Sequence, residues 1–320
     1  MREPQQPDTT ADTAGPAQDA SIAIVVLTHN RVHLLRQCVE NVLSKVSSHT
    51  SEIVIWNNGS TDETQAYLDS LGEPRIRVVH HPANIGQNAY AEIFPSTAAD
   101  YFVKLDDDVI DAPAEWDRVL LEGIQRLPSF GLLAAGLVDD PKDASAYFMY
   151  HVRWHLYSAD EVNGVRLLRG PTGGGATITP RAVNERIGGY QQRRQPFWLE
   201  AAEYIARLQE NGYEVGTLPE LKVHHAGGPY YSEGATAKQD FWDGYVRKVR
   251  RKNTVKRLLL AVPFFSALNE RKGWFEPPEE AEYVALPQEN GYEVAAISEV
   301  KVQRGRWLAL RRRTPAGDPS

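Results

Sequence analysis

Cysteine is almost absent from this sequence, which contains only Cys38 among 320 residues. An intramolecular disulfide needs two thiols and a cysteine-based metal site needs several, so the sequence excludes both. A chain without disulfides suits a reducing compartment. We therefore predict a cytoplasmic location.

Excess positive charge and long apolar runs are also lacking. The formal net charge is −7 at pH 7, whereas general nucleic-acid binders carry a basic field, so we expect no nucleic-acid partner. A membrane-spanning helix needs about 20 apolar residues, but the longest candidate, residues 258–268, is interrupted by Pro263. Residues 1–20 have no apolar core of the kind found in signal peptides, and their Pro, Gln, Asp and Thr content predicts a disordered tail.

A regular alternation of strand and helix patterns begins after this tail. Residues 22–27 form a continuous apolar, β-branched run that predicts a strand buried on both faces, and further strands are predicted at 52–56, 76–80 and 101–105. Between the first two, apolar residues recur at helical spacing from Leu34 to Val46. This alternation predicts an α/β fold with a Rossmann-like, mostly parallel sheet flanked by helices.

Unusually polar loops follow three of the predicted strands, at residues 28–30, 57–60 and 106–108. In open parallel sheets, ligands bind at the carboxyl ends of the strands. The three loops therefore predict a ligand site at that edge of the sheet.

The carboxylate triplet Asp106, Asp107 and Asp108 is the main chemical signal in these loops. Adjacent carboxylates at the end of a buried strand repel one another. A divalent cation removes that repulsion and can bridge to a diphosphate, as Mg²⁺ and Mn²⁺ do; a solvated acidic loop is the alternative. His224 could supply a further metal ligand, although the adjacent His225 offers the same chemistry.

The second half of the chain holds further candidates. Glycines at residues 173–175 would let a backbone approach a ligand closely. Glu200 and Glu203 lie in the first turn of a predicted helix. Carboxylates there interact favourably with the helix dipole, so a structural role is the alternative to a catalytic one. Trp198 precedes them and could stack on a sugar ring or pack in the core.

Taken in order, these elements resemble the family 2 glycosyltransferases of the GT-A fold. The similar segments lie between residues 21 and 257 and read IAIVVLTHNR, IVIWNNGSTDET, NIG, YFVKLDDDV, GPTGGGATITPRAV, IGGY, EAAEYIARLQENGYEV and PELKVHH. The resemblance implies an inverting transfer of a sugar from a nucleoside-diphosphate sugar, with Mn²⁺ or Mg²⁺ as cofactor. It does not identify the acceptor.

The resemblance also implies roles for individual residues. Nucleotide-sugar contacts are expected from Thr28, Asn30, Arg31, Asn57, Asn84, Asp106 and Asp107. Metal ligands are expected at Asp106, Asp108 and His224. Acceptor-side contacts are expected from Gly174, Gly175 and Trp198.

Two departures from the family pattern affect the donor and the catalytic base. Asn57 stands where the family usually has an aspartate that reads the nucleotide base. A UDP-sugar is the favoured donor, but this replacement leaves the base open. Ala201 stands where the family has the catalytic aspartate of its Glu-Asp-x-x-Leu-x-x-Arg pattern. We expect Glu200, one residue earlier, to act as the base, with Glu203 as the alternative.

Two other functions share parts of this pattern. The alanine at position 201 would suit a nucleotide-sugar-binding protein that has lost catalysis. A nucleotidyltransferase would share the sheet and the acidic ligands, but it would need a Gly-rich phosphate loop where this chain has Thr-His-Asn-Arg. We therefore favour the glycosyltransferase.

The expected domain organisation follows from these motifs. A GT-A domain covers residues 21–257, with a nucleotide-binding half at 21–110 and an acceptor half at 111–257. Residues 258–320 form a C-terminal extension. In it, QENGYEV repeats a sequence from the acceptor half and predicts a short β element.

Basic residues between 247 and 257 precede the apolar segment that starts at Leu258. Basic residues beside apolar ones can lie on an anionic membrane surface. A helix that packs on the domain with a solvated basic face is the alternative, and we favour it.

Overall fold

The computed structural model describes most of the chain between residues 19 and 298. The described residues are 19–173, 175–192, 200–228, 230–231, 244, 247, 251–252, 254–272, 280–288 and 291–298. Most of the predicted tail, residues 1–18, lies outside them.

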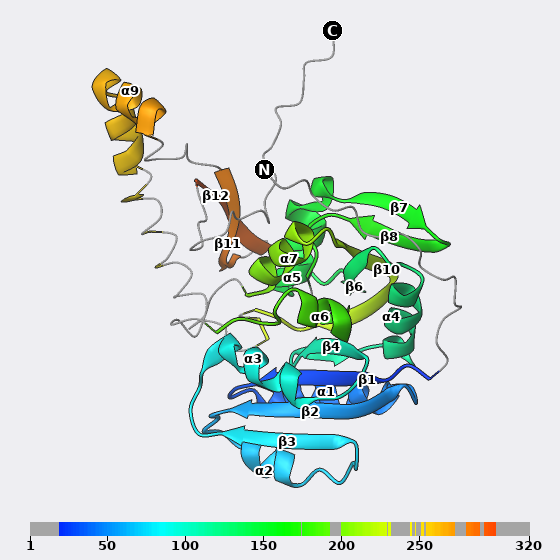
Figure 1. The fold of residues 1–320 in the computed structure, drawn as a ribbon. Coiled ribbons are helices and arrows are strands. Elements are labelled where there is room, and N and C mark those ends of the chain that lie inside the picture. The colour runs from blue at the N-terminus through cyan, green and yellow to red at the C-terminus, as the bar shows by residue number, and fades with distance from the viewer. Residues whose placement is uncertain are drawn as a thin grey trace.

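A single large sheet forms the centre of the described fold (Figure 1). Its strand order is β3-β2-β1-β4-β9-β6-β10-β8-β7, and β5 pairs with β10 off this path. The strands are β1 (Ile22–Thr28), β2 (Thr50–Asn58), β3 (Ile76–His81), β4 (Tyr101–Asp106), β5 (Val109–Asp111), β6 (Phe130–Leu137), β7 (Ser158–Val162), β8 (Val165–Arg169), β9 (Ala176–Pro180) and β10 (Glu214–His225).

Helices connect and cover these strands. They are α1 (Val32–Asn41), α2 (Thr64–Asp69), α3 (Tyr90–Ile93), α4 (Trp116–Gln125), α5 (Ala144–Tyr147), α6 (Arg181–Arg186), α7 (Glu200–Glu210) and α9 (Pro263–Lys272). Short 3-10 or π turns are η1 (Leu43–Lys45), η2 (Gly86–Ala89), η3 (Phe94–Ser96), η4 (Phe148–Val152) and η5 (Trp154–Leu156).

The first four strands of the sheet confirm the predicted α/β fold. β1 pairs in parallel with β2 and β4, and β2 pairs in parallel with β3. The sheet is mixed further on, because β9 runs antiparallel between β4 and β6. β6 and β10 are again parallel. The strands that carry the predicted polar loops therefore end at one edge.

The sheet is covered on both faces, as the apolar run of β1 requires. Ile22, Ile24 and Val26 pack in one core cluster with α1 and α4. Ala23 and Val25 pack in a second cluster, with α3 on the opposite face. Because successive strand residues point to opposite faces, a run with no polar position fits a strand buried on both sides.

The C-terminal extension contains two strands, β11 (Glu280–Gln288) and β12 (Gly291–Ser298), which form an antiparallel hairpin. The second QENGYEV sequence begins at the end of β11 and continues into β12, whereas the first begins at the end of helix α7. No helix within the described ranges is both long and apolar enough to cross a membrane.

Candidate functional site

The aspartate triplet lies in the tight turn between β4 and β5. Asp106 ends β4, and its backbone N–H donates to the carbonyl of Gly175 over 2.7 Å. The carbonyl of Asp108 accepts from the N–H of Ala226 at 2.7 Å. The metal candidates are thus held by backbone hydrogen bonds to the segments before β9 and after β10.

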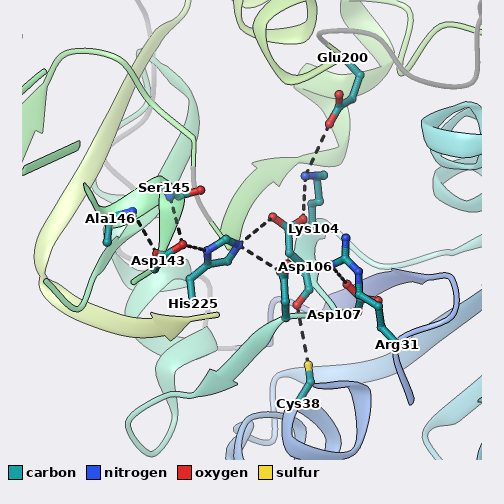
Figure 2. A network of polar contacts seen from close by, with 11 residues as sticks. Arg31, Cys38, Lys104, Asp106, Asp107, Asp143, Ser145, Ala146, Glu200 and His225 are labelled. Carbon is teal, nitrogen blue, oxygen red and sulfur yellow. Dashed lines mark hydrogen bonds and ion pairs between the residues drawn. The ribbon is translucent and has the colours of Figure 1, made fainter. Parts of the chain in front are cut away.

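One histidine joins two of these aspartates. Asp106, Asp108 and His225 each offer one ligand atom, and the three atoms lie within 4.8 Å of one another. The Nε2 atom of His225 is 3.1 Å from Oδ1 of Asp108. The same atom is 3.9 Å from Oδ2 of Asp106 (Figure 2). Opposite ligands of a Mg²⁺-sized ion lie about 4.2 Å apart. Two carboxylates and an imidazole at this spacing can hold Mn²⁺ or Mg²⁺.

The structure corrects the expected histidine. His224 was the predicted ligand, but its Nε2 atom faces Oδ2 of Asp140 at 3.2 Å. The register of β10 shifts between His224 and His225, and of these two histidines only one groups with the carboxylates of the triplet. That histidine is His225, and its second ring nitrogen, Nδ1, lies 2.8 Å from Oδ1 of Asp143.

Protonation of His225 depends on the same neighbours. Burial alone would lower its pKa, but the charges and hydrogen bonds of Asp108 and Asp143 raise that pKa well above its usual value. Without a metal, the ring therefore carries a proton that a metal ion bound at Nε2 must replace.

Arg31 contacts the other side of the triplet. Its Nη1 atom donates to Asp107 at 3.0 Å and to Asp108 at 2.7 Å. The pKa of Arg31 is raised, chiefly by the charge of Asp107. Burial raises the pKa of Asp107 to about 6, although the charge of Arg31 opposes that rise. The resemblance implied that Arg31 contacts the nucleotide; the structure places its side chain against the acidic loop.

Lys104 links the metal candidates to helix α7, a contact the sequence analysis missed. Its Nζ atom is 3.0 Å from Oδ1 of Asp106 and 3.9 Å from Oε1 of Glu200 (Figure 2). Burial alone would lower the pKa of Lys104, but Asp106 and other neighbours raise it well above its usual value. The signal was visible, because a lysine interrupts the otherwise apolar strand YFVKL.

Glu200 and Glu203, the two candidate bases, face different partners. Glu200 is buried, and it contacts Lys104, which in turn contacts Asp106 of the acidic triplet. Glu203 lies 3.7 Å from Nη2 of Arg207, one turn further along α7. Of the two, Glu200 is therefore the one that the structure connects to the metal candidates.

Asn30 and Asn84, two of the expected nucleotide contacts, cross-link the loops at the sheet edge. Asn30, with a positive φ of 53°, accepts at Oδ1 from the backbone N–H of Thr61 over 2.7 Å. Asn84 accepts from the side chain of Asn58 at 2.9 Å and from the N–H of Gly86 at 2.8 Å. These amides hold neighbouring loops in register.

Asn57 and Thr28 are buried, with 2% and 1% of their surfaces exposed. The amide nitrogen of Asn57 lies 3.0 Å from Nδ1 of His80, and its oxygen accepts from the N–H of Ser60 at 3.0 Å. The side chain is thus engaged inside the loop. The hydroxyl of Thr28 has no hydrogen-bond partner among the described residues.

Gly175, on the expected acceptor side, packs against the metal candidates. A Cβ atom there would lie 2.2 Å from Cγ2 of Val109 and 3.1 Å from Cδ2 of His225. Only glycine fits this position without displacing the β5 turn. Gly174 and Trp198, the other acceptor-side candidates, lie outside the described residues.

Solved structures share this fold. A mannosyltransferase from Pyrobaculum calidifontis, in complex with GDP-Man and Mn²⁺, aligns with a TM-score of 0.50 and 18% identity over 75% of this chain and 64% of its own. GalNAc-T7 with UDP, GalNAc and Mn²⁺ aligns with a TM-score of 0.51 and 15% identity over 65% of this chain and 44% of its own. At such identities the likeness establishes the GT-A fold alone, and the alignments span less than two thirds of either relative.

Comparison with curated protein sequences gives no significant match. A family model does match. The model described as glycosyl transferase family 2 covers residues 23–187 of the 320, a range that contains the predicted nucleotide-binding strands and the aspartate triplet. This chain therefore belongs to glycosyltransferase family 2.

Proposed function

We propose that this protein is a metal-dependent, inverting glycosyltransferase that uses a nucleoside-diphosphate sugar. The observation that carries the proposal is the grouping of Asp106, Asp108 and His225 at the end of β4, with ligand atoms within 4.8 Å of one another. Two structures of similar fold contain Mn²⁺ with a nucleotide. A bound cation would neutralise the departing diphosphate.

The metal candidates are supported by cationic side chains. Arg31 contacts Asp107 and Asp108, and Lys104 contacts Asp106. The remaining excess of carboxylates favours a divalent cation. Arg31 would then lie beside the diphosphate and add a positive charge to that of the metal.

Glu200 is our choice for the general base. In the transfer, the acceptor oxygen forms a bond to the anomeric carbon while the bond from that carbon to the diphosphate oxygen breaks. The bonding electrons leave with the diphosphate, and the acceptor proton passes to the carboxylate of Glu200. A single displacement of this kind inverts the anomeric centre. A positioned base typically accelerates such a step by about 10²–10⁴-fold.

The nucleotide base is proposed as uracil, with guanine as the alternative. The family aspartate is replaced by Asn57, whose side chain hydrogen-bonds to His80 and Ser60. The two relatives of similar fold were solved with GDP-Man and with UDP, respectively. Both nucleotides therefore belong in a first screen.

Thermal stability with and without Mn²⁺ tests the metal site and the donor together. Ligands that bind the folded state raise its melting temperature by mass action. We expect UDP or GDP, with or without a sugar, to stabilise the wild type in a Mn²⁺-dependent manner. Asp108→Asn and His225→Gln should abolish that dependence, whereas His224→Gln and the exposed Asp111→Asn should retain it. An equal shift without Mn²⁺, or an unchanged shift in Asp108→Asn, would contradict the proposed site.

A protein that binds the donor but no longer transfers the sugar is the second candidate function. Ala201, at the position of the family's catalytic aspartate, favours it. Donor turnover separates the two functions. If the wild type binds a nucleotide sugar with Mn²⁺ but releases no nucleoside diphosphate with any acceptor tested or with water, the enzyme proposal fails and the binding function stands.

Peripheral contact with an anionic membrane is proposed for the region around α9. Leu258 and Phe264 are 66% and 68% exposed, and the exposed Arg257 adjoins them. Figure 1 shows α9 projecting away from the central sheet. Flotation with phosphatidylserine vesicles at low salt tests this idea, with Leu258→Ser and Phe264→Ser as variants. Absence of wild-type binding would refute it.

A further inference from the structure

Asp143 is a buried carboxylate next to the metal candidates, and it belongs to none of the motifs predicted from the sequence. It is fully buried, and its Oδ1 atom lies 2.8 Å from Nδ1 of His225. The same oxygen accepts from the N–H of Ser145 at 3.1 Å, and Oδ2 accepts from the N–H of Ala146 at 3.0 Å. Asp143 therefore caps helix α5 and holds His225 with one carboxylate (Figure 2).

The direction of these hydrogen bonds fixes the proton on the imidazole. The two oxygens of Asp143 already accept from two backbone N–H groups, and a carboxylate can only accept hydrogen bonds. The ring nitrogen that faces Asp143 must therefore be the one that carries hydrogen. In a neutral imidazole, the lone pair then lies on Nε2, the atom that faces Asp108 at 3.1 Å.

The backbone around His225 keeps the ring in this orientation. The N–H of Ala226 donates to the carbonyl of Asp108 over 2.7 Å, and the N–H of Ala144 donates to the carbonyl of Gly227 over 3.0 Å. A Cβ atom on Gly227 would lie 2.2 Å from Cε1 of His225. Glycine at that position lets the chain pass directly against the ring.

His224 provides an internal comparison for this arrangement. Its Nε2 atom faces Asp140 at 3.2 Å, and Asp140 also accepts from the hydroxyl of Tyr231. The two adjacent histidines thus each face a carboxylate of the segment between β6 and α5. Only His225 presents its second nitrogen to the acidic triplet.

We propose that Asp143 is a positioning residue that holds His225 as the Nδ1–H tautomer, so that Nε2 is available to a divalent metal ion. The inference rests on the proposed metal-dependent function. Carboxylates that hold a metal-bound histidine in this way commonly contribute about 10–100-fold to metal affinity.

Asp143→Asn is the discriminating change. An asparagine retains one oxygen for the helix cap, a position that Asn occupies as well as Asp. Its NH₂ group, turned toward His225, would donate to Nδ1 and move the ring hydrogen to Nε2. Asp117→Asn is the matched control. Asp117, in helix α4, is also fully buried, and it accepts hydrogen bonds from Ser47 and Thr50. Asp140→Asn is the control for the neighbouring histidine.

Two measurements on the full-length protein test the proposal. Titration with Mn²⁺, followed through the paramagnetic resonance of the free ion, should show about 10–100-fold weaker binding for Asp143→Asn. The two controls should bind as the wild type does. Long-range ¹⁵N–¹H spectra of the wild type with saturating Mg²⁺ should show hydrogen on Nδ1 of His225, whose signals are assigned by their loss in His225→Gln.

Three results would overturn the inference in distinguishable ways. Unchanged Mn²⁺ affinity in a folded Asp143→Asn, or an Nε2–H tautomer in the wild type, refutes the role of Asp143 and leaves the metal site intact. Equal losses in Asp140→Asn and Asp143→Asn indicate general disturbance of the segment and also refute it. Absence of Mn²⁺ binding by the wild type refutes the metal site, and this inference with it. If Asp143→Asn does not fold, the wild-type tautomer alone decides.

Discussion

Replacing Arg31 by methionine tests the charge balance of the acidic triplet. Arg31 makes hydrogen bonds of 3.0 Å to Asp107 and 2.7 Å to Asp108, and these carboxylate side chains are only 7% and 11% exposed. Loss of a hydrogen bond to a charged group costs about 1.5–3 kcal/mol. We take this as the cost of removing the Arg31 side chain from Asp108. Asp107 can limit its own cost by taking up a proton.

The pKa of Asp107 sets that limit. Its folded-state pKa is already about 6 and would rise further without Arg31. Protonation then limits the added cost for this carboxyl to on the order of 1 kcal/mol for each pH unit above that pKa. A carboxyl whose folded pKa is raised loses stability as the pH rises toward that value. We therefore expect Arg31→Met to lower the free energy of unfolding by about 3–4 kcal/mol at pH 7, and by on the order of 1 kcal/mol more at pH 8.

Urea unfolding of the metal-free protein at pH 6, 7 and 8 measures this effect. Arg118→Met is the control, because Arg118 pairs with Glu115 and Glu122 at the exposed surface, where such pairs contribute little. Saturating Mn²⁺ should narrow the gap between Arg31→Met and the wild type, since the cation replaces the lost positive charge. A pH-independent loss, or a gap that Mn²⁺ does not change, would refute the reasoning.

Three further outcomes are expected. The raised pKa of His225 leaves a proton on the metal-free ring, so Mn²⁺ affinity should rise by up to about tenfold for each pH unit below that pKa. Calorimetry in buffers of different ionisation enthalpy measures this proton release, and an affinity that is independent of pH would contradict it. Glu200→Gln should lower kcat by about 10²–10⁴-fold while donor affinity is retained, and Glu203→Gln should lower kcat much less. If steady-state kinetics show the larger loss for Glu203→Gln, the base is Glu203. Gly175→Ala should destabilise the protein by about 1–3 kcal/mol, since its Cβ would lie 2.2 Å from Val109; an unchanged melting temperature would show that the turn yields freely.

The N-terminal half of the sheet was predictable because its signals are local. The runs around β1 and β4 have few polar positions, and polar loops follow them at once. Because the parallel strands β1 and β4 end at the same edge of the sheet, the topology predicts that residues 28–31 lie close to the aspartate triplet. The position of Asp106 and Asp108 also needed only local sequence, because Asp106 ends the buried strand β4 and Asp108 lies two residues further on.

The choice between His224 and His225 could not be made in the same way. β10 has irregular register between Leu218 and Lys222 and again between His224 and His225. A bulge adds a residue and changes which face the following side chains occupy. Counting along the strand therefore fails, and Asp143, 82 residues from His225, leaves no local signal beyond a helix cap.

The strand β9 has a mechanical consequence for the two sides of the site. The carbonyl of Gly175, just before β9, receives the N–H of Asp106, and β9 itself pairs with both β4 and β6. A displacement of Gly175 would therefore be transmitted through this hydrogen bond to the backbone of Asp106, a metal candidate. If the proposed function holds, occupancy on either side would alter affinity on the other, and by the same factor in both directions.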